Sequence, residues 1–173
     1  MVHRYGLISD THGALHPEVF PRFEGVEAIL HAGDVCSDSI IGELAAIAPV
    51  HAVAGNCDQV SAELPLRRTV ELPFGLAGIA HGHLHAAKVD ERVKQLAEAF
   101  KAPRLRLVLT GHSHVALKQP VGGVLVVNPG AACPPRMGTW PSVALLLWDD
   151  AADSIEVEFY QLNWSNVPRP RRW

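Results

Sequence analysis

The chain has 173 residues, enough for one domain, and 48% of them are hydrophobic while 19% are charged, which excludes a disordered protein. Lysine and arginine total 15 against 18 for aspartate and glutamate, and the formal charge of −3 argues against a general nucleic-acid binder and a polybasic membrane protein. Three widely spaced cysteines exclude a disulfide framework, and no signal peptide or membrane-spanning run is recognised, so we expect a cytoplasmic protein.

The first third of the chain predicts strands that alternate with helices. Short apolar runs bounded by turn residues are typical of buried strands. The expected strands cover residues 5–8, 28–30 and 50–54. A weak helix is expected over residues 18–23, and a longer amphipathic helix begins at Ser37 or Asp38 and ends before Pro49. Strands that alternate with helices favour parallel βαβ pairing.

Hairpins replace most of the helices in the rest of the chain. The expected strands cover residues 67–72, 76–80, 105–109, 115–119, 124–127, 142–148 and 154–162. Three pairs of them are joined by short turns, which predicts antiparallel hairpins, and one amphipathic helix is expected over residues 89–100. We therefore expect an α/β fold with two mixed sheets and helices outside. It forms a single domain over residues 1–164, followed by a flexible tail over residues 165–173.

Side chains that can bind metal follow several of these strands, at the edge where ligands collect in open α/β sheets. They are Asp10, His12, Asp34, Asn56, His81, His112 and His114. A mixture of oxygen and imidazole ligands suits Mn²⁺, Fe, Zn²⁺ or Ni²⁺, whereas calcium prefers oxygen ligands alone. Seven ligands are too many for one tetrahedral ion, and they suit two ions of higher coordination that share a bridging carboxylate.

Six short motifs occur in order along the chain. They are D-x-H at 10–12, G-D at 33–34, G-N-x-D at 55–58, H-G-H at 81–83, G-H-x-H at 111–114, and N-P-G followed by P-R between 128 and 136. Together they resemble the calcineurin-like metallophosphoesterases, and the last is similar to a motif of their small bacterial and archaeal phosphodiesterase branch. The resemblance runs from about Gly6 to Arg136. One such motif is a weak signal, but chance seldom produces six in order.

The resemblance implies both a fold and a set of metal ligands. The implied fold is a four-layer α/β sandwich, with two sheets packed face to face and helices outside. Two divalent ions are implied, with Mn²⁺ expected and Ni²⁺, Zn²⁺, Fe or Mg²⁺ as alternatives. Asp34 bridges them in this assignment. The remaining ligands are Asp10, His12 and His114 for one ion and Asn56, His81 and His112 for the other.

The resemblance also implies a mechanism, in which a hydroxide that bridges the ions attacks phosphorus in line and no serine or cysteine nucleophile is needed. Asp34, Asn56 and His83 are the expected catalytic residues. His83 has two interpretations, because it either orients a metal ligand or contacts substrate and donates a proton. Arg136 either clamps a phosphate oxygen or is a solvated loop residue.

Several other polar residues are expected to be structural. His31 lies inside a strand, where we expect a hydrogen-bonded interior histidine. Asn128 and Gly130 are expected to shape the loop that closes one side of the site, and Cys36 and Cys133 are expected to be free thiols. The remaining histidines are expected to be ordinary surface or strand residues: His3, His16, His51 and His85.

Two classes of function remain open. The first is a binuclear metal-dependent phosphodiesterase that acts on a small phosphoester, with a phosphomonoesterase or nucleotide hydrolase as its variant. The second is a non-catalytic interaction scaffold, because the vacuolar sorting subunit of retromer resembles the same branch and has an impaired metal site. That subunit departs from the family at the D-G-N positions, whereas Asp34 and Asn56 are intact here, which favours the enzyme. No membrane or nucleic-acid partner is expected, and a homo-oligomer is left open.

Cys57 departs from the broader superfamily, in which many phosphatases and nucleases have a histidine after G-N that can donate a proton to the leaving oxygen. A thiol with an ordinary pKa of about 8.5 is less suited to this task near neutral pH than an imidazole with a pKa of about 6.5. We therefore expect hydrolysis to depend steeply on the acidity of the leaving group.

Overall fold

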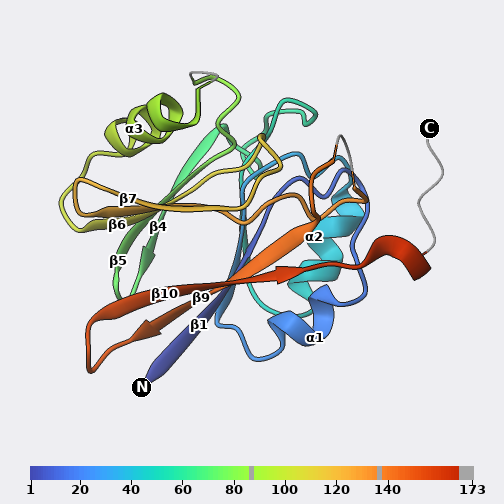
Figure 1. The fold of residues 1–173 in the computed structure, drawn as a ribbon, viewed down its shortest axis with the longest axis horizontal. Coiled ribbons are helices and arrows are strands. Elements are labelled where there is room, and N and C mark those ends of the chain that lie inside the picture. The colour runs from blue at the N-terminus through green and yellow to red at the C-terminus, as the bar shows by residue number, and fades with distance from the viewer. Residues whose placement is uncertain (86–87, 136–137, 168–173) are drawn as a thin grey trace.

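The computed structural model describes residues 1–85, 88–135 and 138–167, which form two five-stranded sheets (Figure 1). Neighbouring strands in the first sheet are β10 (Ser154–Gln161), β9 (Ser142–Asp149), β1 (Val2–Ile8), β2 (Ala28–His31) and β3 (Val50–Ala52). In the second sheet they are β4 (Arg67–Leu72), β5 (Gly75–Ala80), β6 (Leu105–Leu109), β8 (Val124–Asn128) and β7 (Leu117–Val121). The helices are α1 (Val19–Phe23), α2 (Asp38–Ala45), α3 (Val89–Ala99) and a short 3₁₀ helix, η1 (Trp164–Asn166).

The first sheet is built around three parallel strands, β1, β2 and β3. α1 connects β1 to β2 and α2 connects β2 to β3, which is the βαβ pattern that the sequence predicts. The predicted second helix is too long, since α2 ends at Ala45 and an irregular turn leads on to Pro49. Proline has no N–H with which to continue the helical hydrogen bonds, so the segment before it loosens. Parallel strands end at the same edge, so the loops after them lie together.

The second sheet also has a parallel centre, formed by β5, β6 and β8, and α3 connects β5 to β6. Hairpins add β4 beside β5 and β7 beside β8 as the edge strands. The turn between β7 and β8 is shorter than predicted, because Pro120 and Val121 belong to β7 and only Gly122 and Gly123 separate the strands. A proline fits β7 because an edge strand pairs on one side only.

Successive residues of the central strands face different layers of the molecule. Leu7 and Leu107 lie in the core between the two sheets, whereas Ile8 packs in a cluster with α1 and α2, and Val108 packs with α3. Burial on both faces explains why these strands are continuous apolar runs. The layers are therefore α1 with α2, the first sheet, the second sheet, and α3, with the helices on the outer sides in Figure 1. The predicted four-layer sandwich is confirmed.

The last hairpin joins the first sheet, a position that the sequence pattern leaves unassigned. β9 pairs antiparallel with β1, and β10 pairs with β9. η1 follows and buries Trp164 in the cluster around α1 and α2. The predicted domain end at residue 164 therefore falls within η1, which continues to Asn166. Residues 168–173 of the predicted tail lie outside the described residues. No helix within the described part of the chain is long and apolar enough to cross a membrane.

Candidate metal centre

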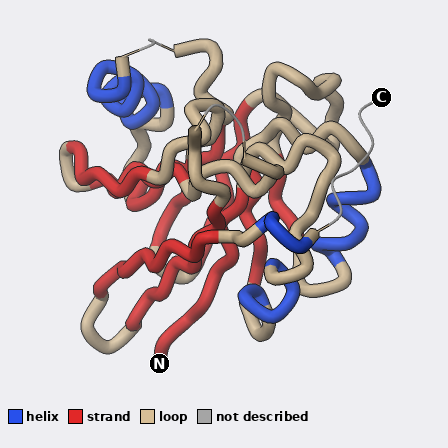
Figure 2. Tube along the Cα trace, turned by 45° about the vertical axis from the view of Figure 1, so that its right-hand side comes forward, coloured by secondary structure: helices blue, strands red, loops and turns tan. Residues whose placement is uncertain are grey.

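The loops that carry the predicted ligands lie at one end of the two sheets, on the upper side in Figures 1 and 2. The loop after β1 carries Asp10 and His12, those after β2 and β3 carry Asp34 and Asn56, and those after β5 and β6 carry His81, His112 and His114. Backbone hydrogen bonds join the first two loops. The Asp10 N–H donates to the Gly33 carbonyl at 2.9 Å, and the His12 N–H donates to the Asp34 carbonyl at 2.9 Å.

Asp10 is fully buried, and one of its carboxylate oxygens has no hydrogen-bond partner among the described residues. Its Oδ2 accepts from the Ser9 hydroxyl at 2.6 Å and from the His112 N–H at 3.1 Å. Its Oδ1 lies 3.2 Å from His114 Nε2 and 3.9 Å from His81 Nε2 without a hydrogen bond to either. A buried anionic oxygen that accepts no hydrogen bond is costly, and a cation beside it would reduce that cost.

Asp34 lies between imidazoles that come from the two different sheets. Its Oδ1 accepts a hydrogen bond from the Cys57 N–H at 2.8 Å. Its Oδ2 lies 3.6 Å from His12 Nε2 and 3.5 Å from His81 Nε2. One carboxylate oxygen is thus fixed by the backbone, while the other faces nitrogens from the β1 loop and the β5 loop. The resemblance implies a bridging role for Asp34, and its position between the two loops is compatible with that role.

His81 is buried, and its orientation is set by the backbone of the first sheet. Its Nδ1–H donates to the Ala32 carbonyl at 2.8 Å, so its Nε2 points toward the carboxylates. This Nε2 lies 3.1 Å from the Asn56 side-chain oxygen. Asp10, Asp34 and His81 each offer one potential ligand atom, and these atoms all lie within 4.8 Å of one another. The three residues form the buried centre of the predicted site.

The remaining predicted residues surround this centre. His12 Nε2 and His114 Nε2 are 3.4 Å apart, and the ring centre of His112 lies 5.2 Å from that of His81. The ring centre of His83 lies 5.4 Å from that of His81. Its buried Nδ1 has no hydrogen-bond partner within the described ranges. The structure therefore brings all the predicted ligands and His83 into one region.

The charges of the centre favour a bound cation. Burial raises the pKa of Asp10, but the imidazoles of His114 and His81 outweigh it, and the net pKa is below its ordinary value. The pKa of Asp34 is lowered in the same way, because its interactions with His81 and the Cys57 N–H outweigh burial. Burial lowers the pKa of His81, yet the two carboxylates outweigh this and raise it. Both carboxylates therefore stay ionised, and their field attracts positive charge.

The backbone of the predicted ligands is unusual. The five with a left-handed φ are Asp10 (54°), His12 (46°), Asp34 (54°), His112 (67°) and His114 (59°). For a residue other than glycine, this backbone conformation lowers stability by about 1–3 kcal/mol, and it is kept only where the surrounding structure enforces it. Strain concentrated at the loops of one sheet edge is typical of a functional site, because the unusual backbone aims side chains that an ordinary turn would direct elsewhere.

Asp58 joins two loops of the candidate centre, a role that the sequence pattern did not reveal. Its carboxylate accepts hydrogen bonds from the backbone N–H groups of Gly55 at 2.8 Å, Cys36 at 2.8 Å and Val35 at 3.1 Å. It thereby fastens the loop after β3 to the loop after β2. The signal was present, since Asp58 is the last letter of the G-N-x-D motif, but the pattern does not show what that carboxylate contacts.

Two predicted structural residues behave as expected. The buried His31 accepts a hydrogen bond from the Gly33 N–H at 3.1 Å, and burial lowers its pKa to about 4, so the ring is neutral. Asn128 donates to the Gly111 carbonyl at 2.8 Å and accepts from the Gly130 N–H at 3.0 Å. His31 therefore supports the turn that leads to the metal centre, and Asn128 shapes the loop beside it.

The prediction for His16 is wrong, because this residue is neither on the surface nor in a strand. It is buried, its Nε2–H donates to the Asn163 carbonyl at 3.0 Å, and its ring packs against Trp164. Both partners come from the end of the described chain, which local sequence around His16 does not reveal. Arg136, for which the sequence leaves both a phosphate clamp and a solvated loop residue open, lies outside the described residues.

The residues present fit a divalent metal centre, so we expect added Mn²⁺ to raise the thermal stability of the metal-stripped protein. The metal binds only the folded state, because only there does Asp10 Oδ1, which accepts no hydrogen bond from a described residue, lie beside the other donor groups. At about 100 times the dissociation constant, binding adds about 2.7 kcal/mol, or roughly 5–10 °C for a chain of this length. Circular dichroism melting curves measure this shift. An equal shift with Ca²⁺, which prefers oxygen ligands alone, would contradict the assignment.

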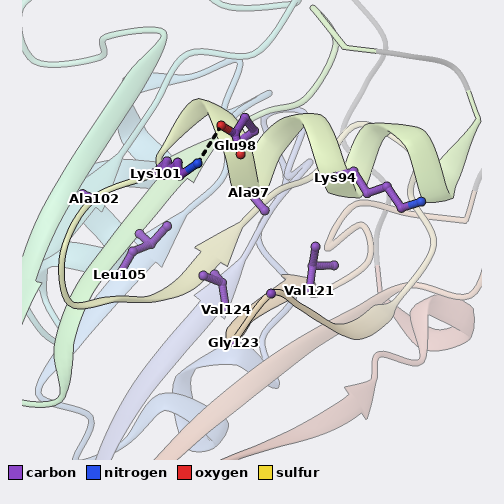
Figure 3. Close-up of a pocket in the computed structure, with 10 residues that line it drawn as sticks. Lys94, Ala97, Glu98, Lys101, Ala102, Leu105, Val121, Gly123 and Val124 are labelled. Carbon is purple, nitrogen blue, oxygen red and sulfur yellow. Dashed lines mark hydrogen bonds and ion pairs between the residues drawn. The ribbon is translucent and has the colours of Figure 1, made fainter.

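A separate hollow of about 610 Å³ lies between α3 and the β7–β8 hairpin (Figure 3). Apolar side chains such as Ala97, Leu105 and Val124 line it, with Lys94 and Lys101 beside them. None of the predicted ligands is part of this lining. The hollow is therefore distinct from the candidate metal centre.

Comparison with known proteins gives a consistent result. The calcineurin-like phosphoesterase superfamily domain matches residues 4–151. A probable metallophosphoesterase of Methanothermobacter thermautotrophicus is 34% identical over 150 residues, which cover 83% of this chain and 85% of that protein. A phosphodiesterase of Methanocaldococcus jannaschii is 30% identical over 162 residues, which cover 83% and 92%. The structure of Vps29 from Entamoeba histolytica has a TM-score of 0.73 at 23% identity, over 92% of this chain and 99% of that chain, and this likeness concerns the fold alone.

Proposed function

The chain belongs to the calcineurin-like phosphoesterase superfamily, and we propose that it is a hydrolase that cleaves a small phosphodiester at a centre of two divalent metal ions. The observation that carries the proposal is the position of Asp34. Its Oδ2 lies 3.6 Å from His12 Nε2 and 3.5 Å from His81 Nε2. A carboxylate between two groups of imidazoles supports two neighbouring cation positions that share one ligand.

Each ion has its own set of ligands in this proposal, and Asp34 is common to both. One set adds Asp10, His12 and His114, and the other adds Asn56, His81 and His112. These oxygen and imidazole donors suit Mn²⁺, with Ni²⁺, Zn²⁺, Fe and Mg²⁺ as alternatives. Divalent ions supply Lewis acidity, which activates water and offsets the charge that develops on the phosphoryl oxygens.

The protein's own contribution is to hold these donors in place before substrate arrives. The hydrogen bond from His81 Nδ1–H to the Ala32 carbonyl keeps the ring from rotating, and Asp58 fixes the two loops that carry Asp34 and Asn56. Such preorganisation is a major source of catalysis, since no reorganisation is needed during the reaction.

We assign His83 to substrate contact, at the margin of the centre. Its ring lies beside those of His81 and His112, with centroid distances of 5.4 Å and 6.2 Å. Its unpartnered buried Nδ1, judged among the described residues, leaves a polar atom for a phosphoryl or leaving-group oxygen. This favours a role in binding or proton transfer over the alternative of orienting a metal ligand.

A substrate screen tests the proposed activity. The full chain, stripped of metal and then loaded separately with Mn²⁺, Mg²⁺, Ni²⁺ or Zn²⁺, is assayed with aryl phosphodiesters, phosphomonoesters and nucleotides. We expect hydrolysis that requires metal and is fastest with a diester, as the name of the Methanocaldococcus relative supports. Faster hydrolysis of monoesters would contradict the diesterase assignment. No hydrolysis of any substrate by the folded, metal-loaded chain would favour an interaction scaffold.

We further expect the rate to depend steeply on the acidity of the leaving group, because Cys57 occupies the place of a proton-donating histidine. Burial and the charge of Asp34 raise the pKa of the Cys57 thiol, which makes it a weaker acid still. A general acid raises the rate about 10²–10⁴-fold. Without one, only esters with an acidic leaving group are expected to react quickly. Rates over a series of substituted aryl diesters measure this dependence. A flat series, with chemistry rate-limiting, would mean that another group such as His83 donates the proton.

A further inference from the structure

Two cysteines lie beside the proposed phosphoesterase centre but belong to neither of its ligand sets. Cys36 is in the loop after β2 and Cys57 is in the loop after β3, and both are exposed. Their sulfur atoms and one ring nitrogen of His12 all lie within 4.8 Å of one another. We call Cys36, Cys57 and His12 the thiol cluster. Its members come from three different loops, so their proximity is a product of the fold.

Backbone hydrogen bonds keep the two cysteines next to each other. The Cys36 N–H donates to Asp58 at 2.8 Å, and the Cys57 N–H donates to Asp34 at 2.8 Å. Asp58 also accepts from the Gly55 N–H at 2.8 Å, so one carboxylate joins both loops. The backbones of the two cysteines are therefore held next to each other by the carboxylates of Asp34 and Asp58.

The spacing within the thiol cluster is that of ligands around one small cation. The Cys36 sulfur lies 3.6 Å from His12 Nδ1. Around a tetrahedral zinc ion, with bonds of about 2.3 Å to sulfur and 2.0–2.1 Å to nitrogen, these two ligands are about 3.6 Å apart. The pair is thus already at the separation that a shared ion requires.

One ring nitrogen of His12 faces the two cysteines, and the other faces the phosphoesterase centre. Its Nε2 lies 3.4 Å from His114 Nε2 and 3.6 Å from Asp34 Oδ2, whereas its Nδ1 faces Cys36. The carboxylates of Asp34 and Asp58 are bonded to the backbone of the two cysteines, and their negative charge favours a cation there.

We propose that Cys36, Cys57 and His12 form a binding site for a thiophilic divalent cation of the zinc and cadmium class. Binding releases the two thiol protons to solvent and leaves a fourth position for water or another ligand. Sulfur donors separate this site from the phosphoesterase centre, whose donors are oxygen and imidazole. A neutral imidazole has one lone pair, so His12 serves one site at a time and a thiophilic ion competes with the centre for it.

Titration with Cd²⁺, followed by ultraviolet absorption, tests the proposal. The full chain is reduced and stripped of metal before titration. Thiolate ligands give a charge-transfer band with Cd²⁺ that carboxylate, amide and imidazole ligands do not, so the readout is independent of hydrolysis. We expect the band to saturate at one ion per chain and to be bleached by competing Zn²⁺. The double variant Cys36→Ser/Cys57→Ser should lose it.

Cys133→Ala is the matched control, because this buried thiol forms a second possible group with His12 and His114. We expect the variant to keep the band. Loss of the band in Cys133→Ala, its persistence in the double variant, or its absence in the parent chain would each overturn the proposal. Circular dichroism checks the fold of each variant. Should the double variant fail to fold, the single variants carry the test, each with roughly half of the band since each keeps one of two sulfur ligands.

Discussion

Asp34→Asn is expected to lower the turnover of an aryl phosphodiester by a factor of about 10²–10³, the scale of losing a group that stabilises transition-state charge. Asparagine has the same shape, tolerates the left-handed backbone of this position and can still accept the hydrogen bond from the Cys57 N–H. It lacks the negative charge that lies between His12 and His81. The fold should therefore survive while the two ions lose their common ligand.

Steady-state kinetics with Mn²⁺ measures the loss, and circular dichroism establishes that the variant is folded. Asp38→Asn is the matched control, because it removes the same charge from an exposed position at the start of α2. We expect this control to keep the turnover of the parent chain. Turnover within a few-fold of the parent in folded Asp34→Asn would contradict the bridging role of Asp34.

Gly55→Ala is expected to abolish metal binding, although it changes no ligand. A Cβ atom at this position would lie 2.1 Å from Asp34 Oδ1 and 2.4 Å from the Asp34 backbone nitrogen. No side chain tolerates such contacts, so the loop that carries Asp34 must move. Overpacking of this kind typically costs about 1–3 kcal/mol of stability. We expect the stabilisation by Mn²⁺ to disappear and hydrolysis to fall with it.

Gly42→Ala provides the control for a glycine that has space around it. Gly42 lies within α2, and nothing is within 4 Å of an added Cβ. Alanine should raise the free energy of unfolding by about 0.5–1 kcal/mol, because it restricts the unfolded chain and favours the helix. Its metal binding should be that of the parent. A Gly55→Ala protein that still gains stability from Mn²⁺ would contradict the account.

Much of the fold could be predicted because its strands are buried on both faces. Leu7 and Ile8 are neighbours in β1 yet lie in different apolar layers, so the strand reads as one unbroken apolar run. Such runs, bounded by glycine and polar residues, are recognisable without knowledge of their partners. The sheet to which the last hairpin belongs was not predictable, because β9 pairs with β1 across more than a hundred residues.

That the predicted ligands lie together could also be predicted, because each follows a strand and parallel strands end at one edge of a sheet. Contacts between residues far apart in the chain could not be predicted from local sequence patterns. Asp58 reaches the backbone of Cys36, and His16 reaches that of Asn163, 147 residues away. The thiol cluster was missed as well, because Cys36 and Cys57 meet only when the loops after β2 and β3 are fastened to each other.

Anomalous diffraction at the manganese absorption edge, from crystals of the full chain soaked in Mn²⁺, tests the central claim most directly. The account predicts two peaks on either side of Asp34, one beside Asp10, His12 and His114 and the other beside Asn56, His81 and His112. A single peak, or none, in crystals saturated with Mn²⁺ would contradict a centre of two metal ions.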